Sequence, residues 1–238
     1  MSYSFGPGPV TPAVKLLLIA NIALFVLQQI VPVIVQYGGL TPGAVFERFW
    51  VWQIVTYMFL HGDIVHLLFN MLPLWMFGVE LERLWGTERF TRYYFYTGIA
   101  AGVSSLLLAK LPFEFAAFFY YTTTVGASGA IYGLLLAYGL LFPYRTVLFL
   151  IFPMQARVFV IITGAIVLWS AVTDIGGGTA HIAHLGGMVF GYLYLTRGRG
   201  GPWTELKYRY TKWKMNRMRK RFDVHQGGRR TPPGGWTH

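Results

Sequence analysis

The sequence predicts an all-α membrane protein whose chain crosses a bilayer six times. Hydrophobic residues make up 55% of its 238 residues and charged residues only 12%, which is roughly half the charged fraction of a soluble domain. The apolar residues gather in blocks, and about 20 of them in a row suffice to span a bilayer. Six blocks read as a membrane helix or most of one: 14–35, 64–81, 93–109, 128–142, 158–172 and 180–196.

The basic residues predict how these helices are oriented. The net charge is +11, and 12 of the 20 Lys and Arg residues follow Leu195. Arg83, Arg89 and Arg92 lie between the second and third blocks, and Arg145 follows the fourth. Basic loops stay in the cytoplasm, so we expect a multi-pass protein of the cell membrane with both termini cytoplasmic. An even number of crossings satisfies this orientation.

The first segments along the chain are a leader, a helix and a loop. Residues 1–13 form a short cytoplasmic leader containing Gly and Pro. The block 14–35 is followed by no small-residue cleavage site, so it is interpreted as a retained helix, not a signal peptide. The connection 38–62 is rich in aromatic residues and contains no segment long enough to span, so we expect an interfacial outer loop lying partly in the membrane.

Two later segments are expected outside the bilayer core. Residues 141–157 alternate in polarity and contain Pro143 and Pro153, which indicates an interfacial or re-entrant linker. Residues 197–238 form a basic cytoplasmic tail after the membrane domain 14–196. Contact with anionic membrane lipids is expected of this tail, and nucleic acid is not an expected partner, because a basic cytoplasmic tail is ordinary in membrane proteins. Apolar residues share one helical stripe in it: Trp203, Leu206, Tyr210 and Trp213.

Several polar side chains are predicted at one depth of the membrane, where each is costly. Ser128 lies 14 residues before the end of the fourth block, and His184 lies 12 residues before the end of the sixth. At 1.5 Å per residue these positions are about 21 and 18 Å above the cytoplasmic side. Asn70 lies at about 18 Å and His66 one turn higher. Three separate helices therefore bring polar groups into one layer.

The fourth block is too short to cross the membrane. Its 15 residues extend about 22 Å, whereas the hydrocarbon core is about 30 Å thick. Ser128 would then begin a helix inside the membrane, and the preceding loop would descend to meet it. A helix N-terminus offers unpaired N–H groups and the positive end of a dipole, which suit an oxyanion that develops beside the serine.

Small residues predict close packing of the fourth and sixth helices. Each of these helices carries a GxxxG pair, a pattern that lets membrane helices approach closely: Gly129 with Gly133, and Gly187 with Gly191. Such an approach would bring Ser128 within reach of His184, and a base beside a serine activates its hydroxyl as a nucleophile. Tyr132, one turn below Ser128, would stack against the imidazole.

Four motifs, in this order along the chain, resemble those of the rhomboid intramembrane serine proteases over roughly residues 52–195. The segment "HGDIVHLLFN" at 61–70 is similar to the family's histidine-and-asparagine helix, and "ELERLWGTER" at 80–89 to its ExxxGxxR element. The segment "GASG" at 126–129 looks like the GxSG nucleophile motif, and "AHLGGMVFG" at 183–191 like the histidine helix. Each motif is weak alone, and the ordered set is specific.

The resemblance implies a six-helix rhomboid-like bundle with an interfacial first outer loop. It implies a catalytic dyad of Ser128 and His184, and substrates that are transmembrane segments with a small residue before the scissile bond. It further implies that supporting residues hold the oxyanion or orient the base: His66, Asn70, Gly126 and Tyr132. One position departs from the family pattern, since Gln53 follows Trp52 where many members have Arg.

Other interpretations remain open. His181 competes with His184 as the base, and Asp63 or Asp174 would be candidates for a third catalytic residue, although both are expected in solvated loops. The chain could also be a proteolytically inactive rhomboid-like protein that binds other membrane proteins, or a small transporter. No metal or cofactor is expected, because H-E-x-x-H is absent and the membrane histidines lack an intramembrane carboxylate. A soluble α/β-hydrolase is disfavoured because Ala130 occupies the position where G-x-S-x-G needs glycine.

Overall fold

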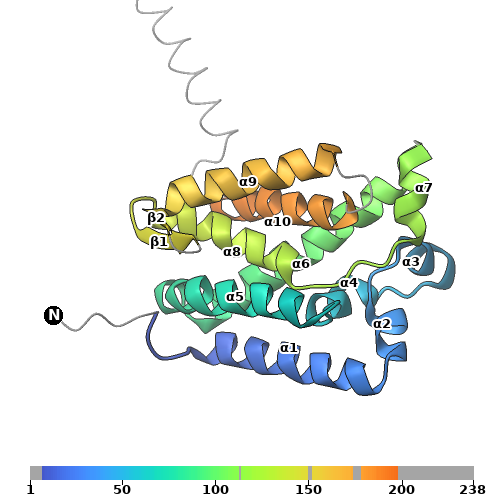
Figure 1. Ribbon diagram of the computed structural model, residues 1–238, viewed down its shortest axis with the longest axis horizontal. Helices are drawn as coiled ribbons and strands as arrows, with labels where there is room; N and C mark the ends of the chain where they lie inside the picture. Colours follow the sequence, from blue (N-terminus) through green and yellow to red (C-terminus); the bar gives the residue numbers. More distant parts are fainter. Residues whose placement is uncertain (1–6, 113, 150–151, 174–177, 198–238) are drawn as a thin grey trace, which may run out of the picture. The chain divides into compact units, whose positions relative to one another are not determined.

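The computed structural model describes residues 7–112, 114–149, 152–173 and 178–197. The chain divides into two units, residues 1–195 and 196–238. The predicted tail lies outside the described residues except for Arg197, as does Asp174. The first unit is built from helices and one small sheet (Figure 1): α1 (Pro12–Ile30), α2 (Val33–Gly38), α3 (Pro42–Arg48), α4 (Gln53–Thr56), η1 (Tyr57–Phe59), α5 (Ile64–Trp85), α6 (Thr87–Ala109), α7 (Glu114–Tyr121), α8 (Ser128–Leu141), β1 (Thr146–Phe149), β2 (Phe152–Gln155), α9 (Ala156–Thr173) and α10 (Gly178–Thr196).

Each of the six predicted blocks overlaps one long helix: α1, α5, α6, α8, α9 and α10. The first block, 14–35, was predicted too long, because α1 ends at Ile30 and residues 33–35 belong to α2. Within the described ranges, three helices are long and apolar enough to cross a membrane, namely α1, α5 and α9. Helix α8 is apolar but shorter. The predominantly helical class is therefore as predicted, and the number of six crossings stays a prediction.

Helix α8 is the centre of the fold. It contacts α5, α6 and α9, and Figure 1 shows it between α5 on one side and α9 with α10 on the other. Most of its residues are buried, including three of its glycines, Gly129, Gly133 and Gly139. A helix that is apolar on every side belongs in a core, so the element that carries Ser128 is held by neighbours all around.

The start of α1 is fixed by a buried carboxylate at the end of α5. Glu82 is 2% exposed. It accepts hydrogen bonds from the backbone N–H groups of Ala13 (2.9 Å) and Val14 (3.0 Å), and from the hydroxyls of Thr11 and Thr87. An anion at a helix N-terminus satisfies its unpaired N–H groups and complements its dipole. Glu82 thus joins α1, α5 and α6.

The connection between α1 and α5, which the sequence predicts to be the first outer connection, folds into the short helices α2, α3, α4 and η1. Its inner side is buried at Tyr57 and Met58, whereas Phe49 and Trp52 are exposed. Gln53 is fully buried; its Oε1 accepts a hydrogen bond from the Thr41 N–H (3.0 Å), and its Nε2 donates to the Tyr37 carbonyl (3.2 Å). At the position where many rhomboids have Arg, the amide of Gln53 therefore holds the loop together.

The connection between α8 and α9, expected to be an interfacial or re-entrant linker, contains two strands. Strands β1 and β2 pair as an antiparallel hairpin, with Thr146 opposite Gln155 and Phe149 opposite Phe152. The alternating polarity of residues 141–157 is explained by these two strands. Pro153 lies within β2, as a proline can in an edge strand. This small hairpin is an addition to a structure that is otherwise built from helices.

Candidate active site

Ser128 is the first residue of α8, as the short fourth block predicted. The segment before it is extended and tied to the first outer connection. Thr124 exchanges two backbone hydrogen bonds with Leu40, of 2.8 and 2.9 Å, and the Gly126 N–H donates to the Tyr57 carbonyl at 2.9 Å. Gly126 has φ +123°, a conformation that glycine adopts readily and other residues rarely do. The serine therefore follows a turn that depends on Gly126.

His184 of α10 meets Ser128 directly. Its Nε2 lies 2.7 Å from the serine Oγ, which is within hydrogen-bond reach of a nucleophile and its base. The ring of Tyr132 stacks on the imidazole, with centroids 4.3 Å apart and an interplanar angle of 19°. His181 lies beside the same imidazole, with ring centroids 6.1 Å apart. The nitrogen that meets Ser128 thus belongs to His184.

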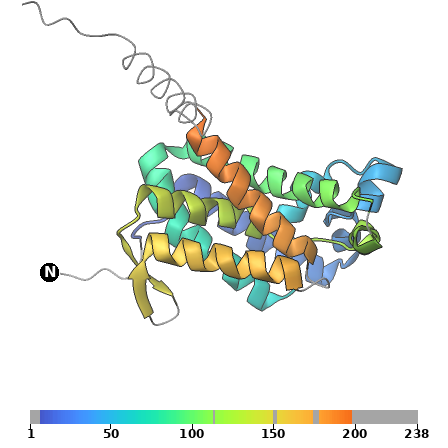
Figure 2. The same ribbon diagram turned by 90° about the horizontal axis from the view of Figure 1, so that it is seen from above.

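Glycines permit this approach of α10 to α8. Figure 2 shows α10, drawn in orange, crossing α8. A Cβ on Gly187 would collide with the Gly129 carbonyl oxygen, and a Cβ on Gly191 would lie 3.4 Å from the Gly133 Cα. The glycines of α8 mainly face α6 instead, since a Cβ on Gly133 would lie 2.7 Å from the Thr97 Cβ. Both predicted GxxxG pairs lie at close helix contacts, and the pair on α8 contacts both α6 and α10.

His66 reaches the same small space from α5. Its Nδ1 accepts a hydrogen bond from the Gly62 N–H at 3.3 Å, so the neutral imidazole carries its proton on Nε2. A Cβ on Gly126 would lie 2.8 Å from this Nε2 and 3.7 Å from the Ser128 Oγ. The absent side chain of Gly126 thus leaves a space that both groups border.

Asn70 lies one turn from His66 and is 3% exposed. Its Nδ2 donates a hydrogen bond of 2.7 Å to the His66 carbonyl within α5. An amide nitrogen carries two N–H donors, so one donor remains beyond this bond. The sequence predicted Asn70 at the depth of Ser128. Its amide also stabilises the helical turn that carries His66.

His61 is a site neighbour whose position the sequence did not reveal. It is 1% exposed, and its ring packs edge-on against His66 with centroids 5.1 Å apart. Burial, together with the neighbouring His66, lowers the pKa of His61 to about 4. Its backbone is held on both sides by the amide of Gln28, to which the His61 N–H donates at 3.2 Å. The adjacent glutamines Gln28 and Gln29 in the apolar block 14–35 were the available signal.

Asp63, one of the two alternatives considered for a third catalytic residue, lies at the start of α5. Its carboxylate accepts a hydrogen bond of 2.8 Å from the His66 backbone N–H and so caps α5. Within the residues that the structure describes, the His184 Nδ1 has no hydrogen-bond partner. In the same ranges, no group of three His, Cys, Asp or Glu side chains could hold a metal ion.

A serine at a helix N-terminus, hydrogen-bonded to a histidine among apolar helices, defines a candidate nucleophile–base site in a helical membrane protein. Residues 48–199 match the family model of the Rhomboid domain. The chain belongs to the rhomboid family.

Three relatives illustrate the similarity. The chain is 34% identical over 144 residues to Rhomboid protein 1, mitochondrial, of Saccharomyces cerevisiae, covering 60% of this chain and 40% of that protein. It is 28% identical over 164 residues to Rhomboid protease GluP of Bacillus subtilis, covering 67% and 28%. It is 30% identical over 158 residues to RHOMBOID-like protein 4 of Arabidopsis thaliana, covering 66% and 36%. The matched part spans 40% or less of each relative's length.

Proposed function

We propose that this protein is an intramembrane serine endopeptidase that cleaves transmembrane segments of other membrane proteins. The observation that carries the proposal is the 2.7 Å contact between the Ser128 Oγ and the His184 Nε2. Ser128 attacks the carbonyl carbon of the scissile peptide bond, and His184 takes the hydroxyl proton and passes it to the leaving amine. Water then hydrolyses the acyl-enzyme with the same histidine as base.

The oxyanion of the tetrahedral intermediate forms in the space beside Gly126. The first backbone N–H groups of α8, which have no partner within their own helix, are the donors we assign to it, and the protonated Nε2 of His66 borders it. The second N–H of Asn70 is a further donor on the same helix. Donors fixed in place before the reaction stabilise such a charge without reorganisation. Tyr132 keeps the imidazole of His184 in one orientation by stacking.

The membrane arrangement follows from the length of α8. Its 14 residues extend about 21 Å, less than the hydrocarbon core of about 30 Å. With six crossings and both termini in the cytoplasm, as the basic loops favour, Ser128 lies inside the membrane toward the outer side. The substrates are therefore membrane-embedded helices, membrane lipids surround the protein, and water enters from the outer side.

Cleavage of a model substrate tests the proposal. Purified protein in liposomes is incubated with a fluorescent single-span protein that has alanine before a cleavable bond near its outer end. The wild-type protein should cut it, and Ser128→Ala should not. Ser170→Ala, which removes a hydroxyl from α9, is the matched control and should cut at the wild-type rate. Equal cleavage by wild type and Ser128→Ala would refute the assignment, and a wild-type protein inert toward several such substrates would favour the inactive membrane-protein binder.

A further inference from the structure

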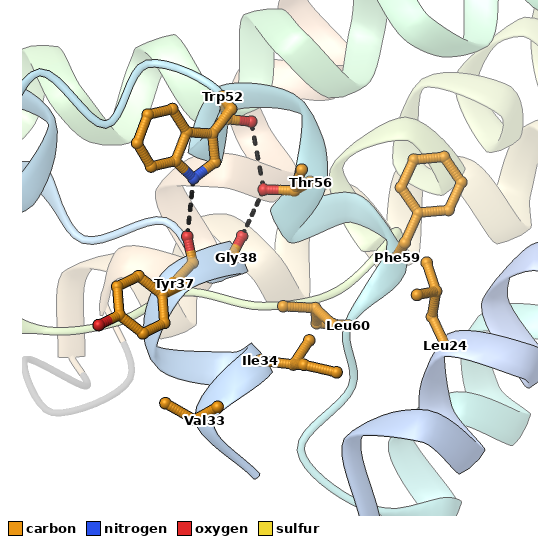
Figure 3. A pocket seen from close by; sticks show the side chains of 9 residues that line it. All are labelled: Leu24, Val33, Ile34, Tyr37, Gly38, Trp52, Thr56, Phe59 and Leu60. Carbon is orange, nitrogen blue, oxygen red and sulfur yellow. Dashed lines mark hydrogen bonds between the residues drawn. The ribbon is translucent and has the colours of Figure 1, made fainter. Parts of the chain in front are cut away.

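A groove between α1 and the first outer connection is not used by the proposed mechanism. It has a volume of about 310 Å³, at the lower end of typical small-molecule sites, roughly 300–1,000 Å³. Figure 3 shows its side chains converging from α1, α2 and the segment of α4 and η1. The groove is lined by Leu24, Val33, Ile34, Tyr37, Gly38, Trp52, Thr56, Phe59 and Leu60.

The surface inside the groove is apolar, because the polar atoms of Trp52 and Thr56 bond to backbone carbonyls. The Trp52 Nε1–H donates to the Tyr37 carbonyl at 2.9 Å, and the Thr56 hydroxyl donates to the Gly38 carbonyl at 2.7 Å (Figure 3). No charged residue is among the described residues that line it. A polar or ionic ligand would find no partner inside and would lose its hydration.

The groove opens beside a surface that faces lipid. Helix α1 is one of the described helices that are long and apolar enough to cross a membrane. Leu27, one turn from the groove residue Leu24 on the same face of α1, is 44% exposed. Water does not fill an apolar cavity, and an empty one forfeits dispersion contacts along its whole lining. In a bilayer, the apolar groups at hand are acyl chains.

The rim of the groove suits the head of a phospholipid. Tyr37 and Trp52 are half exposed, and such aromatic residues prefer the depth of the lipid headgroups. The ring of Trp50 lies 4.9 Å from that of Tyr37, and the Arg48 guanidinium lies over Trp50 at 5.3 Å. Arg48 makes no ion pair with any described residue. Arg48 is thus linked to the groove through the rings of Trp50 and Tyr37, at the expected depth of a phosphate.

We propose that the groove binds one acyl chain of a membrane phospholipid, with the phosphate toward Arg48. The site is connected to the catalytic region through covalent neighbours. Thr56, Phe59 and Leu60 line the groove, while Tyr57 between them accepts the hydrogen bond of Gly126 and His61 after them packs on His66. A lipid in the groove supports the outer face of the segment that holds the site, and its binding does not depend on proteolysis.

Photocrosslinking tests the proposal without an activity assay. The protein is reconstituted in nanodiscs containing phosphatidylglycerol with a diazirine in one acyl chain, irradiated, and mapped by mass spectrometry. We expect adducts concentrated on groove residues of α2 and η1. Ile34→Trp and Leu24→Trp fill the groove and should lower the yield of these adducts about tenfold, the change expected when roughly two methylenes lose their burial.

Ile22→Trp is the matched control, because it adds the same indole to α1 on an exposed position that does not line the groove. It should keep the wild-type yield, and Arg48→Gln should lower the yield with phosphatidylglycerol. Thermal unfolding of each variant verifies that it is folded. Wild-type adducts spread evenly along the exposed face of α1, or an undiminished yield in both filled variants, would overturn the acyl-chain site. An unchanged yield in Arg48→Gln would overturn the placement of the phosphate.

Discussion

At the scale of single residues, Gly126 is where the contacts of the candidate site converge. Its N–H is bound to Tyr57, its φ of +123° is one that residues with a side chain rarely adopt, and its open side borders both His66 and Ser128. A glycine here permits the turn before α8 and, in the proposed mechanism, leaves room for the oxygen of a substrate.

Gly126→Ala should therefore lower cleavage by about 10- to 100-fold, because the methyl group would take up the space beside the His66 Nε2 and strain the turn. Loss of one oxyanion donor typically costs about 10²–10³ in rate, and backbone donors remain here. Initial rates on the model substrate measure the effect. Gly62→Ala is the control, since its Cβ would meet only the His66 Nδ1 at an ordinary 3.8 Å. Wild-type rates in Gly126→Ala would show that the oxyanion does not form in the space beside Gly126.

A second residue-scale prediction separates the two histidines of α10. His184→Ala should abolish cleavage, because its Nε2 is the nitrogen 2.7 Å from the serine Oγ. His181→Ala should keep a measurable fraction, because its ring only flanks the His184 ring. Labelling of Ser128 by a fluorophosphonate probe, followed in parallel, should show the same order. The reverse order in both assays would make His181 the base.

The residues that sequence reasoning found and missed differ in a physical way. Ser128, His184 and His66 are polar groups in apolar blocks, and the helix rise alone put them at one depth. His61 lies in a loop, where a histidine is ordinary. Its burial beside His66 depends on hydrogen bonds to Gln28, which is distant in the sequence. Helix periodicity carries no information about such a contact between a loop and a distant helix.

At the scale of elements, the close crossing of α8 and α10 sets the geometry of the site. The sequence predicted it from two GxxxG pairs, since small residues limit how near two backbones can come. The β1–β2 hairpin was missed because strands of four residues, one of them containing Pro153, leave too short a pattern to distinguish from a linker. The helices of the first outer connection are also too short to show a helical period.

Gly187→Val should separate α10 from α8, because a Cβ at this position would collide with the Gly129 carbonyl. We expect at least about a tenfold loss of cleavage together with a lower melting temperature, as overpacking typically costs about 1–3 kcal/mol. Val189→Leu, at an exposed position of the same helix, is the control and should change neither quantity. Unchanged cleavage in Gly187→Val would show that the site does not depend on the close spacing of α8 and α10.

At the scale of the whole molecule, the fold is held by polar links between helices whose outer faces are apolar. In lipid, helix association gains little from burying apolar side chains, because the surrounding acyl chains are equally apolar. Composition and block length predict the helices, and the family motifs predict which helices meet. The polar hydrogen bonds that join the helices connect residues far apart in the sequence, so no local pattern predicts them. Glu82, which joins α1, α5 and α6 through four hydrogen bonds, is the strongest described example.

Glu82→Gln should lower the free energy of unfolding by about 1.5–3 kcal/mol, the range for hydrogen bonds to charged groups. The amide removes the charge at the α1 N-terminus and turns one acceptor into a donor that faces backbone N–H groups. Unfolding in mixed detergent micelles, followed by circular dichroism, measures the change. Glu88→Gln is the matched control, because Glu88 only pairs at 2.9 Å with Arg92 on an exposed face, where a pair contributes about 0–1 kcal/mol. Equal stability of the two variants would mean that α1 is anchored by its lipid-facing and helix-packing surfaces and not by the carboxylate.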